Sequence, residues 1–325
     1  MGSSNTRIVT KEKGIALLSP TAVAFEKKSG RIVALGAGAK RMLGKTPVGI
    51  EALRPVQGGV IAEPEAATRM LKRYFKRLEA VSLFHRPDVI VSVPCNINEV
   101  ERRALEDTVY DAGARQVFII EAPLAAALGA GLPVAGAKGN MIVNIGGGCT
   151  QVAVLSMGGI VISDSLRVGG IELDRAIVQF LRKKYELLCG ELTAEMLKIK
   201  IGTAWPKFER GISEVAGRDL SGGLTATIKV SSADICEALY GRLEQITAMI
   251  KTTLEETPPE LASDIYDIGI VLTGGGAMLE GLPELITRLT GIRTTRAKNA
   301  PACVCRGIYW CLGNPAAARF VRYRA

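Results

Sequence analysis

The chain has 325 residues and a mass of 34.5 kDa, and 48% of its residues are apolar. At about 150 residues per domain this length predicts two domains, and the composition excludes a disordered, collagen-like or coiled-coil protein. Lysine and arginine outnumber aspartate and glutamate by 41 to 32, but they are dispersed without a nucleic-acid-binding motif, so the charge indicates a solvated surface or an anionic partner such as a membrane or a nucleotide.

Strands and helices are predicted to alternate along the chain. An apolar strand over 89–93 precedes a helix over 98–113, for which Asn98 is the candidate N-cap. Further elements are expected as a strand over 117–120, an alanine-rich helix opening at 124–128, strands over 141–145, 151–156 and 268–272, and a helix from Ala277. This alternation predicts an α/β fold.

The mean hydropathy of +0.22 raises the question of a membrane span. The most apolar stretch, residues 117–135, is long enough to cross a bilayer, but it contains Glu121, Pro123 and Pro133. A spanning helix would bury the carboxylate and be broken twice, so we expect a strand and a helix in a protein core. Residues 1–6 have no apolar region and predict no secretory signal.

Small, loop-like residues over 135–139 indicate where the chain divides. We therefore expect one lobe over 1–137 and a second over 138–325. The irregular, glycine-rich stretch over 206–227 predicts a small peripheral subdomain, around 180–250, within the second lobe.

The seven cysteines are scattered, and there is one histidine. Cys303 and Cys305 are too close together for a CxxC zinc motif, so the pattern predicts free thiols in a reducing cytoplasm.

Two glycine triplets follow strongly apolar strands. The turn of Gly146, Gly147 and Gly148 can present several backbone N–H groups to one anion, and the nearby Thr150 can add a hydroxyl. The second triplet, Gly274, Gly275 and Gly276, suits close approach by a flat ligand. Neither triplet fits a P-loop or a GxGxxG motif, so together they predict a nucleotide held between two lobes in another way.

Ordered motifs over nearly the whole chain resemble the MreB family of bacterial actins, within the actin/Hsp70/sugar-kinase superfamily. They are found at 2–6, 13–15, 42–47, 53–55, 58–62, 100–104, 123–127, 129–131, 193–195, 258–265 and 272–276. The resemblance implies an actin-like (ribonuclease H-like) fold of two lobes, each with a mixed sheet flanked by helices, and a nucleotide cleft between them. It also implies that the C-terminal segment returns toward the first lobe.

The same resemblance implies the cofactor, partners and location. We expect ATP or ADP, with Mg²⁺, and filaments of the protein itself on the inner face of the membrane, where they guide rod-shape cell-wall growth with the cell-wall synthesis machinery. The protein would be cytoplasmic and peripheral to the membrane, with no nucleic-acid partner.

Site residues are implied at the matching positions. Phosphate contacts are expected from Ser3, Ser4, Asn5, Gly146, Gly147 and Gly148, with Thr150 on the phosphate or metal. Ribose and adenine contacts are expected from Glu195, Lys198, Gly274, Gly275, Gly276 and Ala277. Leu83 and Phe84, beside cations, resemble the family's membrane-inserting loop, although ordinary core residues would show the same pattern.

The chain differs from the family pattern where acidic residues are usual. The family's water-orienting Glu is replaced by Ala122, and neutral or basic residues replace other acids at Asn144, Gln151, Ile171 and Lys200. The strand that usually precedes the first phosphate loop, with its Asp, is expected to be missing; a misannotated start, a truncation or an expression tag would explain this as well as a true loss.

These differences predict weaker Mg²⁺ binding and impaired hydrolysis of a nucleotide that the glycine turns still hold. Slow hydrolysis would survive if the water is oriented in another way. A second hypothesis is a pseudo-ATPase paralogue that copolymerises with or caps an active MreB. A sugar kinase is disfavoured because no catalytic Asp can be nominated.

Overall fold

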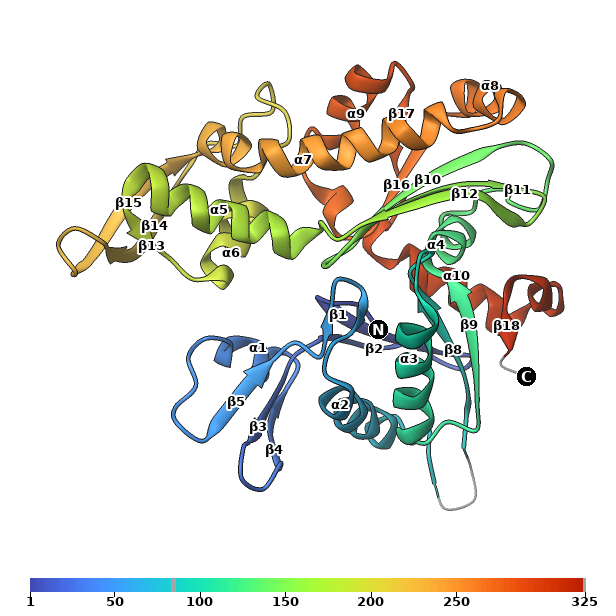
Figure 1. The fold of residues 1–325 in the computed structure, drawn as a ribbon, viewed down its shortest axis with the longest axis horizontal. Helices are drawn as coiled ribbons and strands as arrows, with labels where there is room; N and C mark the ends of the chain where they lie inside the picture. The colour runs from blue at the N-terminus through green and yellow to red at the C-terminus, as the bar shows by residue number, and fades with distance from the viewer. Residues whose placement is uncertain (83–85, 324–325) are drawn as a thin grey trace.

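The structure is a computed structural model, and it describes residues 1–82 and 86–323. Figure 1 shows the chain arranged in two halves, with the blue and cyan elements below and the green, yellow and orange elements above. The red C-terminal segment lies beside the lower half (Figure 1).

A five-stranded sheet forms the centre of the upper half, in the order β12-β11-β10-β16-β17. Its strands are β10 (Asn140–Ile145), β11 (Thr150–Ser156), β12 (Gly159–Leu166), β16 (Ile270–Thr273) and β17 (Thr294–Arg296). Strand β10 pairs antiparallel with β11 and parallel with β16. Every residue of β10 and β11 is buried, as expected for strands covered on both faces.

Alternate residues of β10 and β11 contact different helices. Met141 and Val143 belong to the core that packs against α5 (Gly170–Tyr185) and α7 (Ser232–Glu255). Ile142 belongs to a second core, with α4 (Ala122–Ala130) and α10 (Cys303–Gly313). This two-residue period is that of a strand buried on both sides.

The peripheral part of the upper half is more regular than the sequence indicated. A three-stranded sheet, β13-β14-β15, contains β13 (Leu187–Leu188), β14 (Ile212–Asp219) and β15 (Thr225–Ser231). The expected irregular stretch over 206–227 was therefore wrong for half of its length, because β14 and β15 form a hairpin, whose exposed residues are mostly polar. Helix α6 (Glu191–Ile201) packs beside it.

Two sequence-based boundaries near the second glycine triplet were also wrong. Residues 259–268 form helix α8 (Pro259–Ile268), and Gly269, at φ 97°, ends it, so β16 begins at Ile270. The helix expected from Ala277 is a single 3₁₀ turn (Gly276–Met278), and α9 (Leu282–Thr290) begins after it.

The lower half contains a parallel pair, β8 (Asp88–Val93) and β9 (Gln116–Glu121). Helices α2 (Pro64–Arg77) and α3 (Glu99–Asp111) cover one face, and Asn98 caps α3 through a capping box with Glu101, which confirms the predicted N-cap. The short strand β18 (Arg322–Tyr323) pairs with the other edge of β9.

The remaining strands of the lower half form smaller sheets. Strands β1 (Asn5–Thr10) and β2 (Gly14–Pro20) make a hairpin. Helix α1 (Ala37–Met42) packs on another small sheet, which has the strand order β4-β3-β5. The other strands are β3 (Val23–Glu26), β4 (Ile32–Leu35), β5 (Ile50–Leu53), β6 (Val56–Gln57) and β7 (Val60–Ile61).

Helices α4 (Ala122–Ala130) and α10 (Cys303–Gly313) cross where the two halves meet. A Cβ atom added to Gly129 would lie 1.8 Å from the carbonyl oxygen of Cys303, and one added to Gly307 would lie 1.8 Å from that of Ala125. Only glycine permits this approach of the two backbones. The stretch 117–135 thus forms β9 and α4, and within the described residues no helix is both long and apolar enough to cross a membrane.

Candidate functional site

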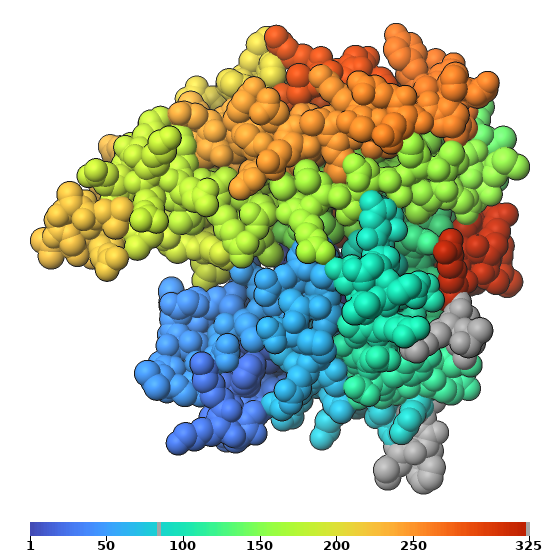
Figure 2. Space-filling view, viewed as in Figure 1, coloured from blue at the N-terminus to red at the C-terminus, as the bar shows by residue number. Residues whose placement is uncertain are grey.

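A cleft of about 620 Å³ lies between the two halves and is lined by residues of both. Figure 2 shows the blue and cyan half meeting the green half along a line across the molecule. The volume lies within the roughly 300–1,000 Å³ of small-molecule sites.

Both glycine turns reach this cleft. Ser4, Asn5, Gly146 and Gly147 line it, whereas Ser3 and Gly148 lie immediately behind. The Ser3 hydroxyl oxygen accepts a hydrogen bond from the backbone N–H of Gly59, at 3.0 Å. The loop at Ser3 therefore packs against both Gly59 and the first glycine turn, and this packing holds the first glycine turn beside the start of β1.

The first turn also contacts the start of helix α5. The N–H groups of Gly170 and Ile171 donate to the carbonyls of Gly146 and Gly147, at 2.9 and 2.8 Å. The N–H groups of Gly147 and Gly148 themselves have no backbone acceptor among the described residues. Because the N-terminus of a 16-residue helix carries partial positive charge, these donors and this helix end form a site suited to phosphate.

Thr150 is placed differently from the sequence-based expectation. It is fully buried, does not line the cleft, and donates its hydroxyl to the carbonyl of Val168, at 2.7 Å. In this arrangement the hydroxyl fixes the turn against β12 and α5, and its contact with phosphate or metal stays a prediction.

The second glycine turn closes another side of the cleft. Gly274 has φ +83°, and a Cβ atom there would lie 2.2 Å from the carbonyl oxygen of Ile145. Gly275 and Gly276 line the cleft, while Ala277 is fully buried behind them. The backbone therefore borders the cleft directly, which suits the close approach of a flat ring.

Helix α6 contributes Glu195 and Lys198, and both are ion-paired. Glu195 pairs with Lys40 of the other half, at 2.6 Å between Oε2 and Nζ. Lys198 pairs with Asp174, at 2.7 Å, and donates to the carbonyl of Gly170, at 2.6 Å. The structure thus brings the two predicted residues to the cleft together with two partners that the sequence did not indicate.

Asp174 is the main site residue that sequence reasoning missed. It lines the cleft and is 6% exposed, and its burial raises its pKa to about 6 even though Lys198 opposes that rise. The sequence signal that could have found Asp174 was its position on the helix, because Leu173, Asp174 and Ile177 share the buried stripe of α5. An acid in an apolar stripe requires a partner, and Lys198 is that partner.

Four cleft residues are neutral where the family resemblance expects acids. Asn144, Gln151, Ala122 and Ile171 all line the cleft. The Asn144 Oδ1 atom lies 3.4 Å from the Thr273 hydroxyl. Gln151 is 2% exposed, and its Oε1 atom has no hydrogen-bond partner among the described residues.

This donor set fits a nucleotide but does not fit a carboxylate-held Mg²⁺. Unpaired N–H groups and a helix N-terminus suit phosphates, whereas Mg²⁺ is usually held by one or two carboxylates. Of the cleft carboxylates Asp174, Glu195 and Glu280, the first two are already paired with lysines, and no group of three or more potential metal ligands occurs within the described residues. Lys200 lies off the cleft and donates to the Ser213 hydroxyl, at 3.1 Å.

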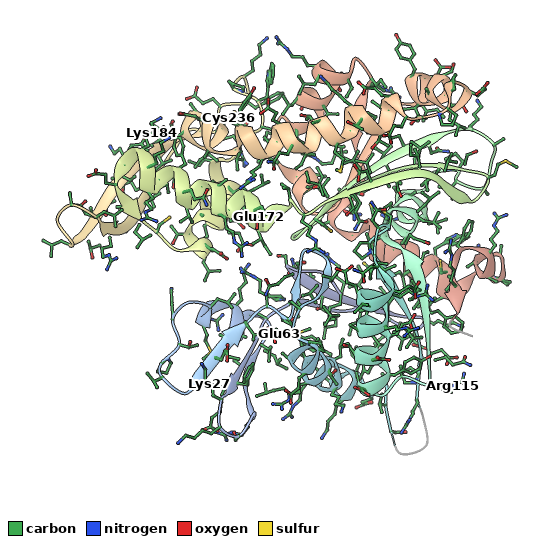
Figure 3. All side chains as sticks on the ribbon, in the orientation of Figure 1. Lys27, Glu63, Arg115, Glu172, Lys184 and Cys236 are labelled. Carbon is green, nitrogen blue, oxygen red and sulfur yellow. The ribbon has the colours of Figure 1, made fainter. Side chains whose placement is uncertain are left out.

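Ion pairs also bridge the two halves at the edge of the cleft. Arg54 contacts Glu191 at 2.8 Å, and Arg175 contacts Glu191 at 3.1 Å and also Glu172. Partial burial alone would raise the pKa of Glu191, but hydrogen bonds from Arg54 and Arg175 lower it overall. Figure 3 shows Glu172 at the end of α5 nearest the lower half.

The predicted membrane residues Leu83 and Phe84 lie outside the described residues.

Two halves around a glycine-lined cleft, with a mixed sheet behind the phosphate turn, define the class of actin-like proteins. The filament-forming MamK, solved as a double helical filament, has the same fold, with a TM-score of 0.78, 19% identity, and coverage of 96% of this chain and 97% of that chain. Because the identity is low, this likeness supports the fold alone.

Closer similarities identify the family. The MreB/Mbl protein family matches residues 1–319. The cell shape-determining protein MreB of Escherichia coli strain K12 is 45% identical over 312 residues, which cover 94% of this chain and 90% of that protein. The chain belongs to the MreB/Mbl family.

Structures of MreB5 of Spiroplasma citri support the same assignment. They have TM-scores of 0.89 with ADP bound and 0.90 with AMPPNP bound, at 35% identity, and cover 94% of this chain and 92% of that chain.

Proposed function

We propose that this chain is a filament-forming protein of cell-shape determination that binds ATP or ADP in the cleft but hydrolyses it poorly or not at all. The observation that carries the proposal is the contrast between the free N–H groups of the first glycine turn and the neutral cleft residues Ala122, Asn144 and Gln151. Nucleotide binding is further supported by the similarity to a protein solved with ADP and with AMPPNP.

The reduced hydrolysis follows from the identity of three cleft residues. Ala122 cannot orient a water molecule, and Asn144 and Gln151 offer a metal no negative charge. Loss of a positioned general base costs ~10²–10⁴ in rate, and loss of carboxylate ligands weakens Mg²⁺. If Mg²⁺ binds, the nucleotide's own phosphates supply most of its negative charge.

A restored variant tests this proposal. Ala122→Glu, Asn144→Asp and Gln151→Glu together return acids to the positions where the family resemblance expects them. We expect ATP to raise the melting temperature of the unmodified protein almost equally with and without Mg²⁺. The restored variant should depend on Mg²⁺ and release phosphate ~10²-fold faster.

The control variant is Glu214→Gln, which changes an exposed charge on β14, away from the cleft and from both glycine turns. It should leave phosphate release unchanged. Phosphate release by the unmodified protein as fast as by the restored variant would contradict impaired hydrolysis, and no thermal shift with either nucleotide would contradict nucleotide binding.

We propose further that the filaments lie on the inner face of the membrane and guide growth of the cell wall with its synthesis machinery. The named cell-shape role of the Escherichia coli relative supports this assignment. Light scattering should report assembly, and sedimentation with anionic liposomes should report membrane binding, which Phe84→Ala should weaken. Equal sedimentation of the unmodified protein and of Phe84→Ala would contradict a role in membrane binding for the loop that contains Phe84.

A regulatory paralogue is the second candidate. The same neutral residues, Ala122, Asn144 and Gln151, favour a subunit that copolymerises with or caps an active MreB without turnover. Mixing it with an active relative distinguishes the two: a regulator changes the partner's assembly at substoichiometric amounts, and an independent filament does not.

A further inference from the structure

Helix α2 carries a row of positive charge along its exposed face. The helix has five cations and one acid, Glu65, and that acid pairs with Arg69. The other four cations are exposed and form no ion pair among the described residues; they are Lys72, Arg73, Lys76 and Arg77. We call these four residues the basic row of α2.

The spacing of the basic row places it opposite the buried face of the helix. At 100° per residue its four members fall within an arc of about 140°. The large apolar residues of α2 fall in the opposite arc and belong to the cores beneath the helix; they are Met70, Leu71, Tyr74 and Phe75. The helix is therefore held by its apolar side, and its cations extend into solvent.

The turn between β3 and β4 extends this positive surface. Arg69 donates a hydrogen bond to the carbonyl oxygen of Gly30, so the turn lies beside α2. Lys28 of the same turn is exposed and has no ion-pair partner in the part of the chain that the structure describes. Figure 1 shows α2 with β3 and β4 along the lower edge of the molecule.

The opposite edge of the molecule has the opposite charge. Residues 254–267, which end α7 and form most of α8, contain five acids and no lysine or arginine. Figure 1 shows α8 at the upper edge, away from α2. Near an anionic surface, this distribution of charge turns the basic row toward the surface and α8 away from it.

We propose that the basic row of α2 is a lipid-binding surface that lies against the anionic headgroups of a membrane. This inference rests on the proposed membrane location and gives it a contact surface among the described residues. Long lysine and arginine side chains suit a headgroup layer, because their charged ends reach outward from the helix. Four such cations together raise binding to an anionic membrane by about 10³-fold at low salt.

The basic row gives reversible binding that depends on charge. Because the large apolar residues of α2 are buried, the row attracts headgroups without inserting a side chain into the hydrocarbon. Attraction of this kind is screened by salt over about 10 Å at 0.1 M. Binding through the basic row should therefore fall steeply with ionic strength, whereas an inserted apolar loop should be much less sensitive to salt.

The test is sedimentation of the full chain with phosphatidylcholine vesicles that contain about 30% phosphatidylserine, at about 50 mM salt. The protein is kept below the concentration at which light scattering reports assembly. The unmodified protein should bind these vesicles, and about 300 mM salt should release most of it. Vesicles of phosphatidylcholine alone should bind little.

A row variant changes all four residues of the basic row to glutamine, which keeps the helix propensity. It should bind about 10³-fold more weakly, and Lys72→Gln with Lys76→Gln should bind about 30-fold more weakly. Lys72→Arg with Lys76→Arg keeps the charge and should bind as the unmodified protein does.

A matched control removes the same charge from the upper half. It changes four exposed cations to glutamine, namely Arg182, Lys183, Arg218 and Lys229, and should weaken binding a few-fold at most. None of the substituted residues lines the nucleotide cleft, so the thermal shift with ATP should be the same in every variant. Melting curves establish that each variant is folded.

The outcomes separate the basic row from the proposed membrane location. Equal binding by the unmodified protein and the row variant, or equal losses in the row variant and the matched control, would overturn the basic row. A loss of binding in Phe84→Ala with none in the row variant would support the loop and overturn the basic row. No binding of the unmodified protein to either kind of vesicle would overturn both. Binding to a DNA duplex that needs the basic row, without binding to vesicles, would make a nucleic acid the partner instead.

Discussion

The two halves of the molecule use their central strands differently. In the upper half, five strands form one continuous sheet, and all residues of β10 and β11 are buried. In the lower half, the β1–β2 hairpin and the β18-β9-β8 sheet are separate among the described residues. The continuous sheet pairs β10 with β16 and so holds the two glycine turns that follow them side by side, whereas the described strands of the lower half lie in several smaller sheets.

The largest expected effect concerns the helix crossing that joins these halves. Gly307→Ala would place a Cβ atom 1.8 Å from the Ala125 carbonyl oxygen. Because both contacting groups are backbone, α4 and α10 must separate, and we expect a loss of about 3 kcal/mol or more in the free energy of unfolding. Urea unfolding measures this loss.

The control is Gly313→Ala, on the same helix, where an added Cβ atom meets nothing within 4 Å. It should be neutral or slightly stabilising, because alanine favours helix. Equal unfolding free energies for the two variants would show that the crossing does not hold the halves together.

The next effect concerns a buried charge in the continuous half. Burial raises the pKa of Asp174 from 3.8 to about 6. A carboxyl whose folded pKa is raised contributes stability that is present below about pH 4 and lost as the pH rises through about 6. Asp174→Asn should therefore remove up to about 3 kcal/mol of pH dependence between pH 4 and 7.

Thermal unfolding at several pH values checks this expectation against Asp267→Asn, which alters an exposed carboxylate. A pH profile of Asp174→Asn that matches those of the wild type and of the control would contradict a raised pKa at this position.

A smaller effect compares the two sheets directly. Val143 of β10 is fully buried, and Val91 of β8 is 7% exposed and lines a cavity of about 1180 Å³ in the lower half. Truncation to alanine should cost about 2 kcal/mol at Val143 and about 1 kcal/mol at Val91, because atoms beside an existing cavity have fewer neighbours to lose. Urea unfolding of both variants measures these losses in the free energy of unfolding. Equal losses would mean that the two sheets are packed equally well.

Much of the local structure was predictable from the sequence. Asn98 and Glu101 form the capping box, and the apolar runs ending at Ile145 and Thr273 are strands that lead into glycine turns. The errors arose where pattern alone is ambiguous. Ile268 continues an apolar run, yet it ends α8, because Gly269 changes the chain direction between a helix and a strand of similar composition.

The sequence by itself determined the α/β alternation, the two glycine turns and the neutral residues Ala122, Asn144 and Gln151, because residue identity is sufficient for each. Only the tertiary structure decided that Asp174 partners Lys198 and that Thr150 faces Val168. These facts depend on contacts between residues distant in the chain. Such contacts are chosen by packing and burial, which no local pattern encodes.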